Sequence, residues 1–281
     1  MTIMEAIKKG MIELKNSNIE SPKLKSRLLM QSILNKSRQY VIVNDMEELN
    51  EKQKNKYFEA ISKVRNGIPL EHITHQKEFM KLNFFVDENV LIPRQDTEIL
   101  VEEVINIAKR INAKNILDLC TGSGAIAVSL AKYIPQSEIT AIDISDRALK
   151  VAKKNAINNQ VENQITFINS DMFTNLNNGK FDIIVSNPPY IKRNVINNLD
   201  DEVKKEPYIA LDGGEDGLDF YRKIVKEAYQ NLKYGGYLCL EIGFDQKIDV
   251  IELIENEEKY ENTYSKKDLY DNDRIIITRV K

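Results

Sequence analysis

The sequence predicts an α/β protein in which a small helical domain and a β-hairpin precede a doubly wound, mostly parallel sheet. Apolar residues recur at helical spacing through residues 1 to about 75, which indicates a helical domain. From Thr97 onwards, strand-like and helix-like segments alternate, which is typical of a parallel sheet covered by helices. The chain of 281 residues is long for one domain and sufficient for two.

The first part of the chain, residues 1–75, is expected to form a helical domain. Its first helix has an apolar face made of Ile3, Ala6, Ile7, Met11 and Leu14. A second helix starts at Ser21-Pro22, because proline is favoured at the first helical position. Asn50 is suited to cap a third helix, and Gly67 lies just past its end.

The next part, residues 76–93, is predicted to form a β-hairpin linker, because polar and apolar residues alternate roughly before Asp87-Glu88-Asn89. The remaining residues, 94–281, carry the alternation of strands and helices. The strand candidates are residues 115–119, 138–142, 165–168, 181–186, 235–242, 261–265 and 274–280. Helices fill the intervals, for example Ala125–Tyr133 and Asp146–Asn158. The last two strands lie close together in the sequence, so we expect them to be antiparallel.

Composition and charge restrict the class of function. The formal net charge of −3 gives no basic excess, whereas a protein that grips bare duplex DNA needs Lys or Arg for each neutralised phosphate. Cys120 and Cys239 lie in apolar, strand-like runs, which suits a reducing cytosol rather than a disulfide framework. No secretion signal or membrane-spanning run is recognisable, so a cytoplasmic location is expected. His72 and His75 have no Cys or acidic residue at metal-ligand spacing, so no metal site is expected.

Residues 116–127 combine a buried strand, a glycine turn and the start of a helix, which indicates a cofactor site. Gly122 and Gly124 permit a tight turn and a close approach of the backbone to a ligand. Asp118 lies near the carboxyl end of this strand, and Asp143 ends the next one, where an acid accepts hydrogen bonds from both ribose hydroxyls of an adenosine cofactor. A turn that binds nothing is the alternative, and the coincidence of the loop with the second acid argues against it.

Two classes of cofactor fit this loop, and the charge of Asp118 favours one of them. Residues 122–127 also fit the dinucleotide fingerprint, with alanine as its last small residue. A carboxylate just before the loop would face the anionic pyrophosphate of a nicotinamide cofactor. It would instead face the cationic methionine end of S-adenosylmethionine, directly or through water. The sign of the charge therefore predicts S-adenosyl-L-methionine.

The segment Asn187-Pro188-Pro189-Tyr190, at the end of a buried strand, is the most specific feature of the sequence. Consecutive prolines fix φ and lack backbone donors, so the Pro188 carbonyl is left pointing outward, and Asn187 adds a side-chain acceptor. The two acceptors suit the two hydrogens of an NH2 group. Tyr190 offers a flat face for a planar amide or base. A proline-rich turn without a function is the alternative.

The paired acceptors match the chemistry of methyl transfer to an amide nitrogen. The lone pair of such a nitrogen is delocalised into the carbonyl, so the nitrogen is a poor nucleophile. Positive charge builds on it as the methyl group transfers, and acceptors at its hydrogens stabilise that charge and align the lone pair. No strong base is needed beforehand, because the N–H acidity rises as the new bond forms. The sequence therefore predicts an N-methyltransferase.

Over essentially its whole length, the sequence resembles the release factor glutamine methyltransferases, also called the HemK family. The segments that carry the resemblance are residues 91–98, 118–125, 186–191, 206–211, 214–222, 241–243 with Gln246, and 273–274. Asn-Pro-Pro-Tyr alone is shared with adenine-N6 DNA methyltransferases, whereas the surrounding set is much more specific. The resemblance implies a helical N-terminal domain, a hairpin linker and a Rossmann-like seven-stranded methyltransferase domain.

The resemblance also implies a substrate, which is the glutamine of the Gly-Gly-Gln motif in class 1 peptide chain release factors. The methyl group would go to its side-chain amide nitrogen, leaving S-adenosyl-L-homocysteine, and neither a membrane nor a direct nucleic-acid partner is expected. The implied cofactor contacts are Asp118, Cys120, Thr121, Gly122, Ser123, Gly124, Asp143, Met172 and Asn187. The implied glutamine contacts are Asn187, Pro188, Pro189 and Tyr190, of which Asn187, Pro188 and Tyr190 are expected to be catalytic.

The sequence departs from the family pattern at three positions. Gln95 stands where the family usually has proline, and Cys120 stands where it usually has glycine. Met172 replaces a common aromatic residue near the adenine, so we expect thioether packing there instead of stacking. Arg94 is assigned either to orienting loops, by pairing with a carboxylate, or to binding the substrate. Residues 212–217 form either a lid with glycine hinges or a solvated loop.

Two other functions compete with this prediction. A nucleic-acid amino-group N-methyltransferase would use the same acceptors and the same tyrosine, but the negative charge and the lack of a basic arm argue against it. A non-catalytic ribosome-associated binding protein would not need an intact Asn187-Pro188-Pro189-Tyr190. The helical domain, residues 1–75, is expected to recognise the protein substrate, because one small side chain offers few handles for selection.

Overall fold

The computed structural model describes residues 1–176 and 179–281, and the chain divides into two compact units. The first unit consists of Met1–His75 together with Asp200–Lys205, and the second consists of Gln76–Leu199 and Glu206–Lys281. Each unit has a hydrophobic core of its own. No helix in the described part of the chain is both long enough and apolar enough to cross a membrane.

The first unit is helical. Its helices are α1 (Ile3–Asn16), α2 (Pro22–Leu34), α3 (Arg38–Val43), α4 (Glu51–Arg65) and α5 (Leu70–Thr74), and its returning segment contains the short 3-10 helix η2 (Val203–Lys205). Asn50 caps α4 as predicted, since its side chain accepts a hydrogen bond from the amide of Gln53 while the Gln53 side chain accepts one from Asn50. Leu14, Leu29 and Tyr57 are among the fully buried side chains that hold the helices together.

The returning segment Asp200–Lys205 is anchored within the first unit by an ion pair between Lys25 and Glu202. The Lys25 side chain is largely buried, with 16% of its surface exposed. A segment distant in sequence from residues 1–75 is therefore part of the same compact unit, which the helical periodicity of those residues does not reveal.

The second unit is built on a sheet whose strand order is β5-β4-β3-β6-β7-β9-β8, seven strands in the described ranges. The strands are β3 (Asn115–Leu119), β4 (Glu138–Asp143), β5 (Ile165–Asn169), β6 (Phe181–Ser186), β7 (Leu232–Glu241), β8 (Tyr260–Lys267) and β9 (Asp273–Val280). The neighbouring strands in the run β5-β4-β3-β6-β7 pair in parallel, and β9 is antiparallel to both β7 and β8. The predicted sheet, with its last two strands antiparallel, is confirmed.

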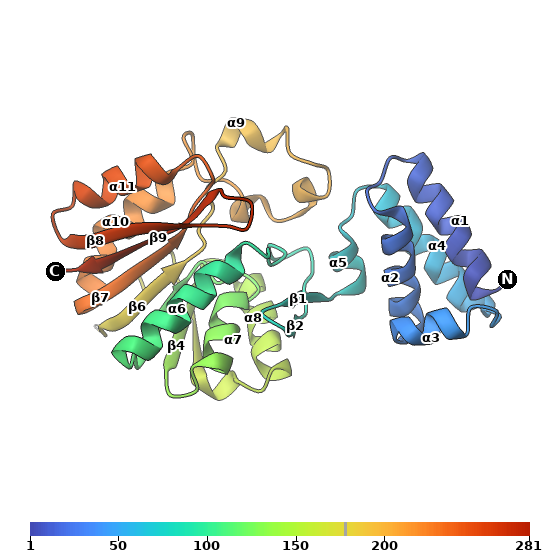
Figure 1. Cartoon of the computed structure of the whole chain (residues 1–281), viewed down its shortest axis with the longest axis horizontal. Helices are drawn as coiled ribbons and strands as arrows, with labels where there is room; N and C mark the ends of the chain where they lie inside the picture. The colour runs from blue at the N-terminus through green and yellow to red at the C-terminus, as the bar shows by residue number, and fades with distance from the viewer. Residues whose placement is uncertain (177–178) are drawn as a thin grey trace. The chain divides into compact units, whose positions relative to one another are not determined.

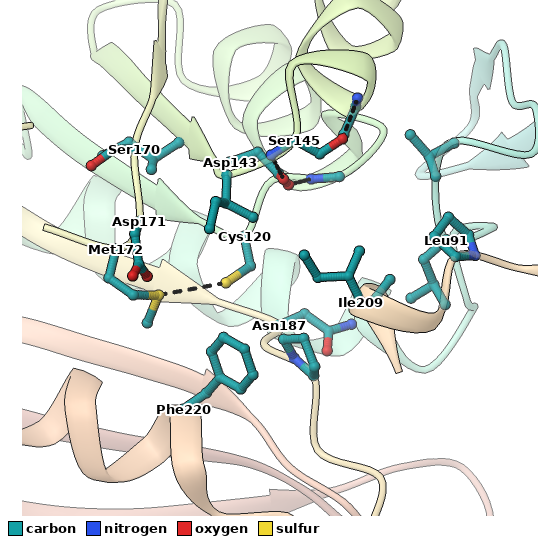
Figure 2. A pocket seen from close by; sticks show the side chains of 18 of the residues that line it. Leu91, Cys120, Asp143, Ser145, Ser170, Asp171, Met172, Asn187, Ile209 and Phe220 are labelled. Atoms are coloured by element: carbon teal, nitrogen blue, oxygen red, sulfur yellow. Dashed lines mark hydrogen bonds between the residues drawn. The ribbon is translucent and has the colours of Figure 1, made fainter. Parts of the chain in front are cut away.

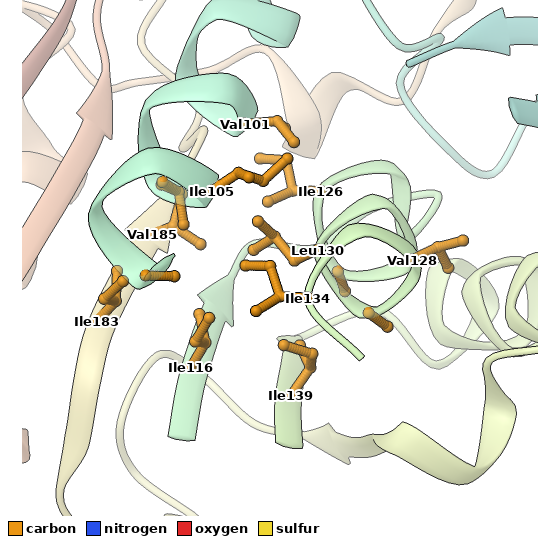
Figure 3. Packing of buried hydrophobic residues seen from close by; sticks show 14 of the residues in the cluster. Val101, Ile105, Ile116, Ile126, Val128, Leu130, Ile134, Ile139, Ile183 and Val185 are labelled. Atoms are coloured by element: carbon orange, nitrogen blue, oxygen red, sulfur yellow. The ribbon is translucent and has the colours of Figure 1, made fainter. Parts of the chain in front are cut away.

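Helices cover both faces of this sheet (Figure 1). On one face lie α6 (Thr97–Ile111), α7 (Ala125–Tyr133) and α8 (Asp146–Asn158), and on the other lie α10 (Asp219–Asn231) and α11 (Lys247–Glu255). Successive strand residues alternate between the two cores, so Ile116 packs on the first face and Leu117 on the second. Figure 3 shows Ile126 and Leu130 of α7, and Ile134 directly after this helix, packed over the first face.

The hairpin of β1 (Lys77–Phe79) and β2 (Leu82–Phe84) packs into the core of the second unit. Phe79 and Phe84 are each only 1% exposed and belong to the cluster on the α6 and α7 face. The turn is held from outside, because the Met80 amide donates to Glu98 Oε1 at 2.6 Å and Tyr133 Oη donates to the Met80 carbonyl at 2.6 Å. The hairpin is thus covered and held by the second unit.

The topology identifies where a ligand would bind. β3 pairs with β4 on one side and with β6 on the other, so the direction of strand addition reverses at β3. Crevices open outside the carboxyl ends of parallel strands at such a reversal. The connection that follows β6 includes the short helices α9 (Arg193–Ile196) and η3 (Tyr208–Ala210), whereas the 3-10 helix η1 (Glu162–Gln164) leads from α8 into β5.

Candidate functional site

A pocket of about 270 Å³ lies at the carboxyl ends of β3, β4, β5 and β6. Its walls come from the loops that follow these strands, from residues 89–91 and from the segment that contains η3. Cys120, Gly122, Asp143, Met172, Asn187 and Pro189 are the predicted site residues that line it. Figure 2 shows Cys120, Asp143 and Met172 on one side of the pocket and Asn187 on another.

The loop between β3 and α7 follows the path that its glycines permit. Gly124 has a φ of +78°, and a Cβ atom there would lie 2.9 Å from Cβ of Ala152 on α8, so no larger residue fits. Cys120 also has a positive φ, +59°, which a residue with a side chain adopts at a cost. The departure to cysteine therefore places a side chain in a left-handed position, and its sulfur lies 3.9 Å from that of Met172 in the pocket wall.

Asp118 holds the loop from beneath and does not line the pocket. Its Oδ2 accepts hydrogen bonds from Thr121 Oγ1 at 2.6 Å and from the Ala127 amide at 3.1 Å. Burial raises the pKa of this carboxyl to about 7. Its Oδ1 is buried and has no hydrogen-bond partner among the described residues. Asp118 thus supports the loop with Oδ2, and its Oδ1 is left without a partner among the described residues, so of the two contacts expected with a cationic ligand the one through water is the more compatible with its burial.

Asp143, the last residue of β4, faces the pocket. Its Oδ2 accepts from the Gly122 amide at 2.8 Å and its Oδ1 accepts from the Ser145 amide at 2.9 Å. Partial burial raises the pKa of Asp143, and these backbone donors oppose that rise. A carboxylate has about four acceptor positions, so this one retains lone pairs for a ligand.

Asn187 follows β6 and enters the pocket beside Pro189. Its Nδ2 donates to the hydroxyl of Thr97 at 3.2 Å, so the amide nitrogen faces α6 and the amide oxygen remains for the pocket. Tyr190 lies outside the pocket wall and packs against the core on the α10 face. Burial raises the pKa of Tyr190, so its phenol is a neutral group. Pro188 is buried and likewise lies outside the wall.

Several pocket residues were not anticipated from the sequence. Phe220 at the start of α10 and Ile209 of η3 both line the pocket, and Figure 2 shows the Phe220 ring between Met172 and Asn187. Asp171, next to Met172, adds a carboxylate to the wall. Phe220 and Ile209 lie inside segments that carry the family resemblance, which was the available signal, but neither segment has a spacing that indicates a pocket.

Arg94 lies outside the pocket wall and pairs with a buried carboxylate. Glu206, whose side chain is 2% exposed, accepts hydrogen bonds from Arg94 Nη2 and, at 2.8 Å, from the Ile92 amide. These bonds join residues 91–94 to the segment that continues into Pro207 and Ile209, both of which line the pocket. Of the two roles considered for Arg94, the geometry favours the orientation of loops.

Replacement of Arg94 by alanine is accordingly expected to lower stability. Glu206 would keep the Ile92 amide but lose its only side-chain cation among the described residues. Since Arg94 is itself 37% exposed, we expect a loss of about 1–2 kcal/mol, below that of a fully buried pair. Urea unfolding measures it, with Arg193→Ala as the matched control, because its pair with Asp212 is more exposed. Unchanged stability with a raised KM for the protein substrate would instead assign Arg94 to substrate binding.

The segment of residues 212–217 is packed against the strand-end tetrapeptide. A Cβ atom on Gly217 would lie 2.5 Å from the Tyr190 carbonyl oxygen, and Gln246 Nε2 donates to the carbonyls of both Tyr190 and Gly217 at 3.0 and 3.1 Å. Asp212 pairs with Arg193, and Asp216 pairs with Arg222. Gly217 therefore allows a close approach to Tyr190, and Asp212 and Asp216 are engaged in ion pairs.

Known proteins share both parts of this chain. Residues 94–206 match the family described as Methyltransferase small domain, and residues 5–74 match the PrmC N-terminal domain. The catalytic domain of hMettl16, solved in complex with MAT2A 3'UTR hairpin 6, superposes with a TM-score of 0.57 at 13% identity, covering 82% of each chain. At that identity the similarity shows the fold alone, which is that of the Rossmann-like methyltransferases.

Closer relatives cover the whole length. The release factor glutamine methyltransferase of Clostridium acetobutylicum is 41% identical over 280 residues, which are 99% of this chain and 98% of that protein. The enzyme of the same name from Clostridium botulinum is 39% identical over 282 residues, which are 99% of both chains. The helical unit and the methyltransferase unit are thus matched together and in the same order, and the resemblance seen in the motifs is confirmed. The chain belongs to the release factor glutamine methyltransferase family.

Proposed function

We propose that this protein transfers a methyl group from S-adenosylmethionine to the side-chain nitrogen of the glutamine in the Gly-Gly-Gln motif of class 1 release factors. The observation that carries the proposal is the position of Asn187, whose side chain enters the pocket at the carboxyl end of β6 with its nitrogen bonded to Thr97. Relatives at 39% and 41% identity over nearly the whole chain bear the corresponding name.

The residues around the pocket fit S-adenosylmethionine. Asp143 has lone pairs for the ribose hydroxyls, and Met172, Ile142 and Phe220 provide apolar surface for the adenine. Asp171 provides an acceptor for the adenine amino group. The left-over Oδ1 of Asp118, buried beneath the loop, is suited to the cationic methionine end through a water molecule. Bound in this way, the cofactor would supply an electrophilic methyl group.

The substrate amide would be held by acceptors of this chain. Asn187 Oδ1 accepts one hydrogen of the glutamine NH2 group, and the Pro188 carbonyl accepts the other. Both acceptors gain strength as positive charge develops on the nitrogen, so they stabilise the transition state more than the bound amide. With the phenol of Tyr190 neutral and the residue half-buried, its part in the proposal is a flat apolar face and not that of a base.

The competing proposal, methylation of a nucleic-acid amino group, uses the same acceptors. Incubation of the enzyme with labelled S-adenosylmethionine and a cell extract, followed by separation of protein from nucleic acid, decides between them. Label in a single release-factor-sized protein supports the proposal, whereas label in the nucleic acid overturns it.

The free thiols of Cys120 and Cys239 suit a reaction in the cytoplasm.

Replacement of Asp143 by alanine is expected to weaken S-adenosylmethionine binding at least about tenfold. Each charge-assisted hydrogen bond to a ribose hydroxyl contributes roughly 1.5–3 kcal/mol, and the alanine removes the acceptor of both. Calorimetric titration measures the change, and Asp143→Asn, which keeps one oxygen, should lose less. Asp146→Ala, an exposed acid in the first turn of α8, serves as the control. Unchanged affinity in a folded Asp143→Ala protein would show that another acid binds the ribose.

A further inference from the structure

A buried carboxyl group lies behind Asn187 and has no part in the reaction proposed above. Glu241 is the last residue of β7 and is 1% exposed. Ser186 of β6 pairs with Leu240 of β7, so Asn187 and Glu241 follow side by side at the strand ends. Within residues 1–176 and 179–281, Glu241 Oε2 has no hydrogen-bond partner. A buried carboxylate with so few donors is costly to the fold, which points to a function.

The hydroxyl of Thr97 interacts with both side chains. Thr97 is the first residue of α6, is 4% exposed, and accepts the 3.2 Å hydrogen bond from Asn187 Nδ2. A hydroxyl has one hydrogen to donate, and Glu241 is the carboxyl group beside it, since both Thr97 and Asn187 act on that carboxyl as hydrogen-bonding groups. An ionised carboxylate only accepts. Thr97 therefore accepts from Asn187 Nδ2 and turns its own hydrogen toward Glu241, and the Asn187 amide also acts on this carboxyl directly.

We propose that Glu241, acting through Thr97, is a positioning residue that fixes the orientation of the Asn187 amide with its oxygen toward the pocket. If the amide turned over, its oxygen would face the Thr97 hydroxyl. That hydroxyl would have to give its hydrogen to Asn187, and the buried carboxylate would lose it. The carboxylate thus fixes the direction of the Thr97 hydroxyl hydrogen. The Thr97 oxygen can then only accept, which fixes the orientation of the Asn187 amide. The inference rests on the proposed role of Asn187 as an acceptor.

The protonation state of the Glu241 carboxyl makes the orientation of the Asn187 amide sensitive to pH. Burial raises the pKa of Glu241 to about 7, against the hydrogen bond from Thr97 and the charge of Arg274. The charged and titratable groups that face it are Asp96, Arg274, Tyr190 and Tyr221. Below its pKa the carboxyl is neutral and itself a donor, so Thr97 is free to turn its hydrogen to Asn187. Turnover should therefore rise with pH through about 7 and level off above it.

The first test compares two substitutions of Thr97. Thr97→Val keeps the shape of the side chain and removes the hydroxyl, and it should lower kcat about fivefold to tenfold, the effect of losing one hydrogen bond. Thr97→Ser keeps the hydroxyl and should retain at least about half of the wild-type kcat. Both variants should bind S-adenosylmethionine with affinities within about twofold of wild type. Equal kcat values for the valine and serine variants would overturn the proposal.

The second test follows the pH profile of Glu241→Gln. The glutamine cannot ionise, so the rise of kcat near pH 7 should disappear and kcat should stay low across the profile. Asp118 has a similarly raised pKa, so a rise that persists unchanged in this variant would belong to Asp118 and would overturn the proposal. A merely structural role would lower Tm and leave the profile in place. If Asn187→Ala itself keeps its turnover, the acceptor role fails instead, which separates the two failures.

Discussion

An Asn187→Ala enzyme is expected to turn over about a hundredfold more slowly than wild type, or slower still. The alanine removes one of two acceptors that would stabilise positive charge on the glutamine nitrogen, and loss of one such partner costs roughly 2.7–4 kcal/mol of the barrier. Most of the loss should appear in kcat and little in KM for the release factor, because the acceptor's interaction strengthens only as charge develops. Single-turnover kinetics with purified release factor measure both.

The control for this experiment is Asn194→Ala, an exposed asparagine of α9 in the connection that follows the tetrapeptide. It should turn over as the wild type does. Asn187→Ala also leaves the Thr97 hydroxyl without its donor, so its Tm should be measured alongside. A folded Asn187→Ala enzyme that retains most of its turnover would remove Asn187 from the reaction.

Most strands were predictable because each is a short, buried, β-branched run between turn signals. β3 and β6 begin and end at the predicted residues, and the ends of most others shift by one or two. β7 was the larger miss, since it starts at Leu232 and not at residue 235. Gly235 and Gly236 obscure its first part, and the structure accommodates them with a positive φ at Gly235 and a register shift against β6. The short helices α3 and α5 contain too few residues to show a period.

The site was predictable only where one segment carries its own chemistry. The glycine loop and Asn187 can each be recognised from a pattern of a few consecutive residues. Phe220 and Ile209, in contrast, reach the pocket from distant segments. Asp118 illustrates the same limit. Its place at the strand end was correct, but its burial depends on the turn back to Thr121 and Ala127, which takes up one of its two oxygens. Likewise, nothing local to Arg94 indicates Glu206, 112 residues away along the chain.

Deletion of the helical unit is the second change for which we expect a large effect on activity toward the release factor. The chemistry proposed for the pocket does not need this unit. Free glutamine is abundant, and its side chain is too small to be selected by contacts at the amide alone. Selection of one glutamine on one protein must therefore use binding energy from surfaces far from the reacting atom. We propose that residues 1–75 provide such a surface. Both core clusters of the sheet lie in the second unit, so a chain that begins at Gln76 is expected to fold and to bind S-adenosylmethionine.

Such a shortened chain should lose most of its activity on intact release factor, whereas activity on a short Gly-Gly-Gln peptide, which we expect to be weak for the full-length enzyme, should change little. The deletion also strips Asp200–Lys205 of the residues it packs with, so full-length Lys25→Ala, which removes only the ion pair to Glu202, is the matched control. That variant should keep its activity on both substrates, because the surface of residues 1–75 remains. Equal losses on peptide and protein, in a shortened chain shown to be folded, would mean that the helical unit supports the catalytic unit and does not recognise the release factor. A Lys25→Ala enzyme as impaired as the deletion would assign the effect to the anchoring of Asp200–Lys205.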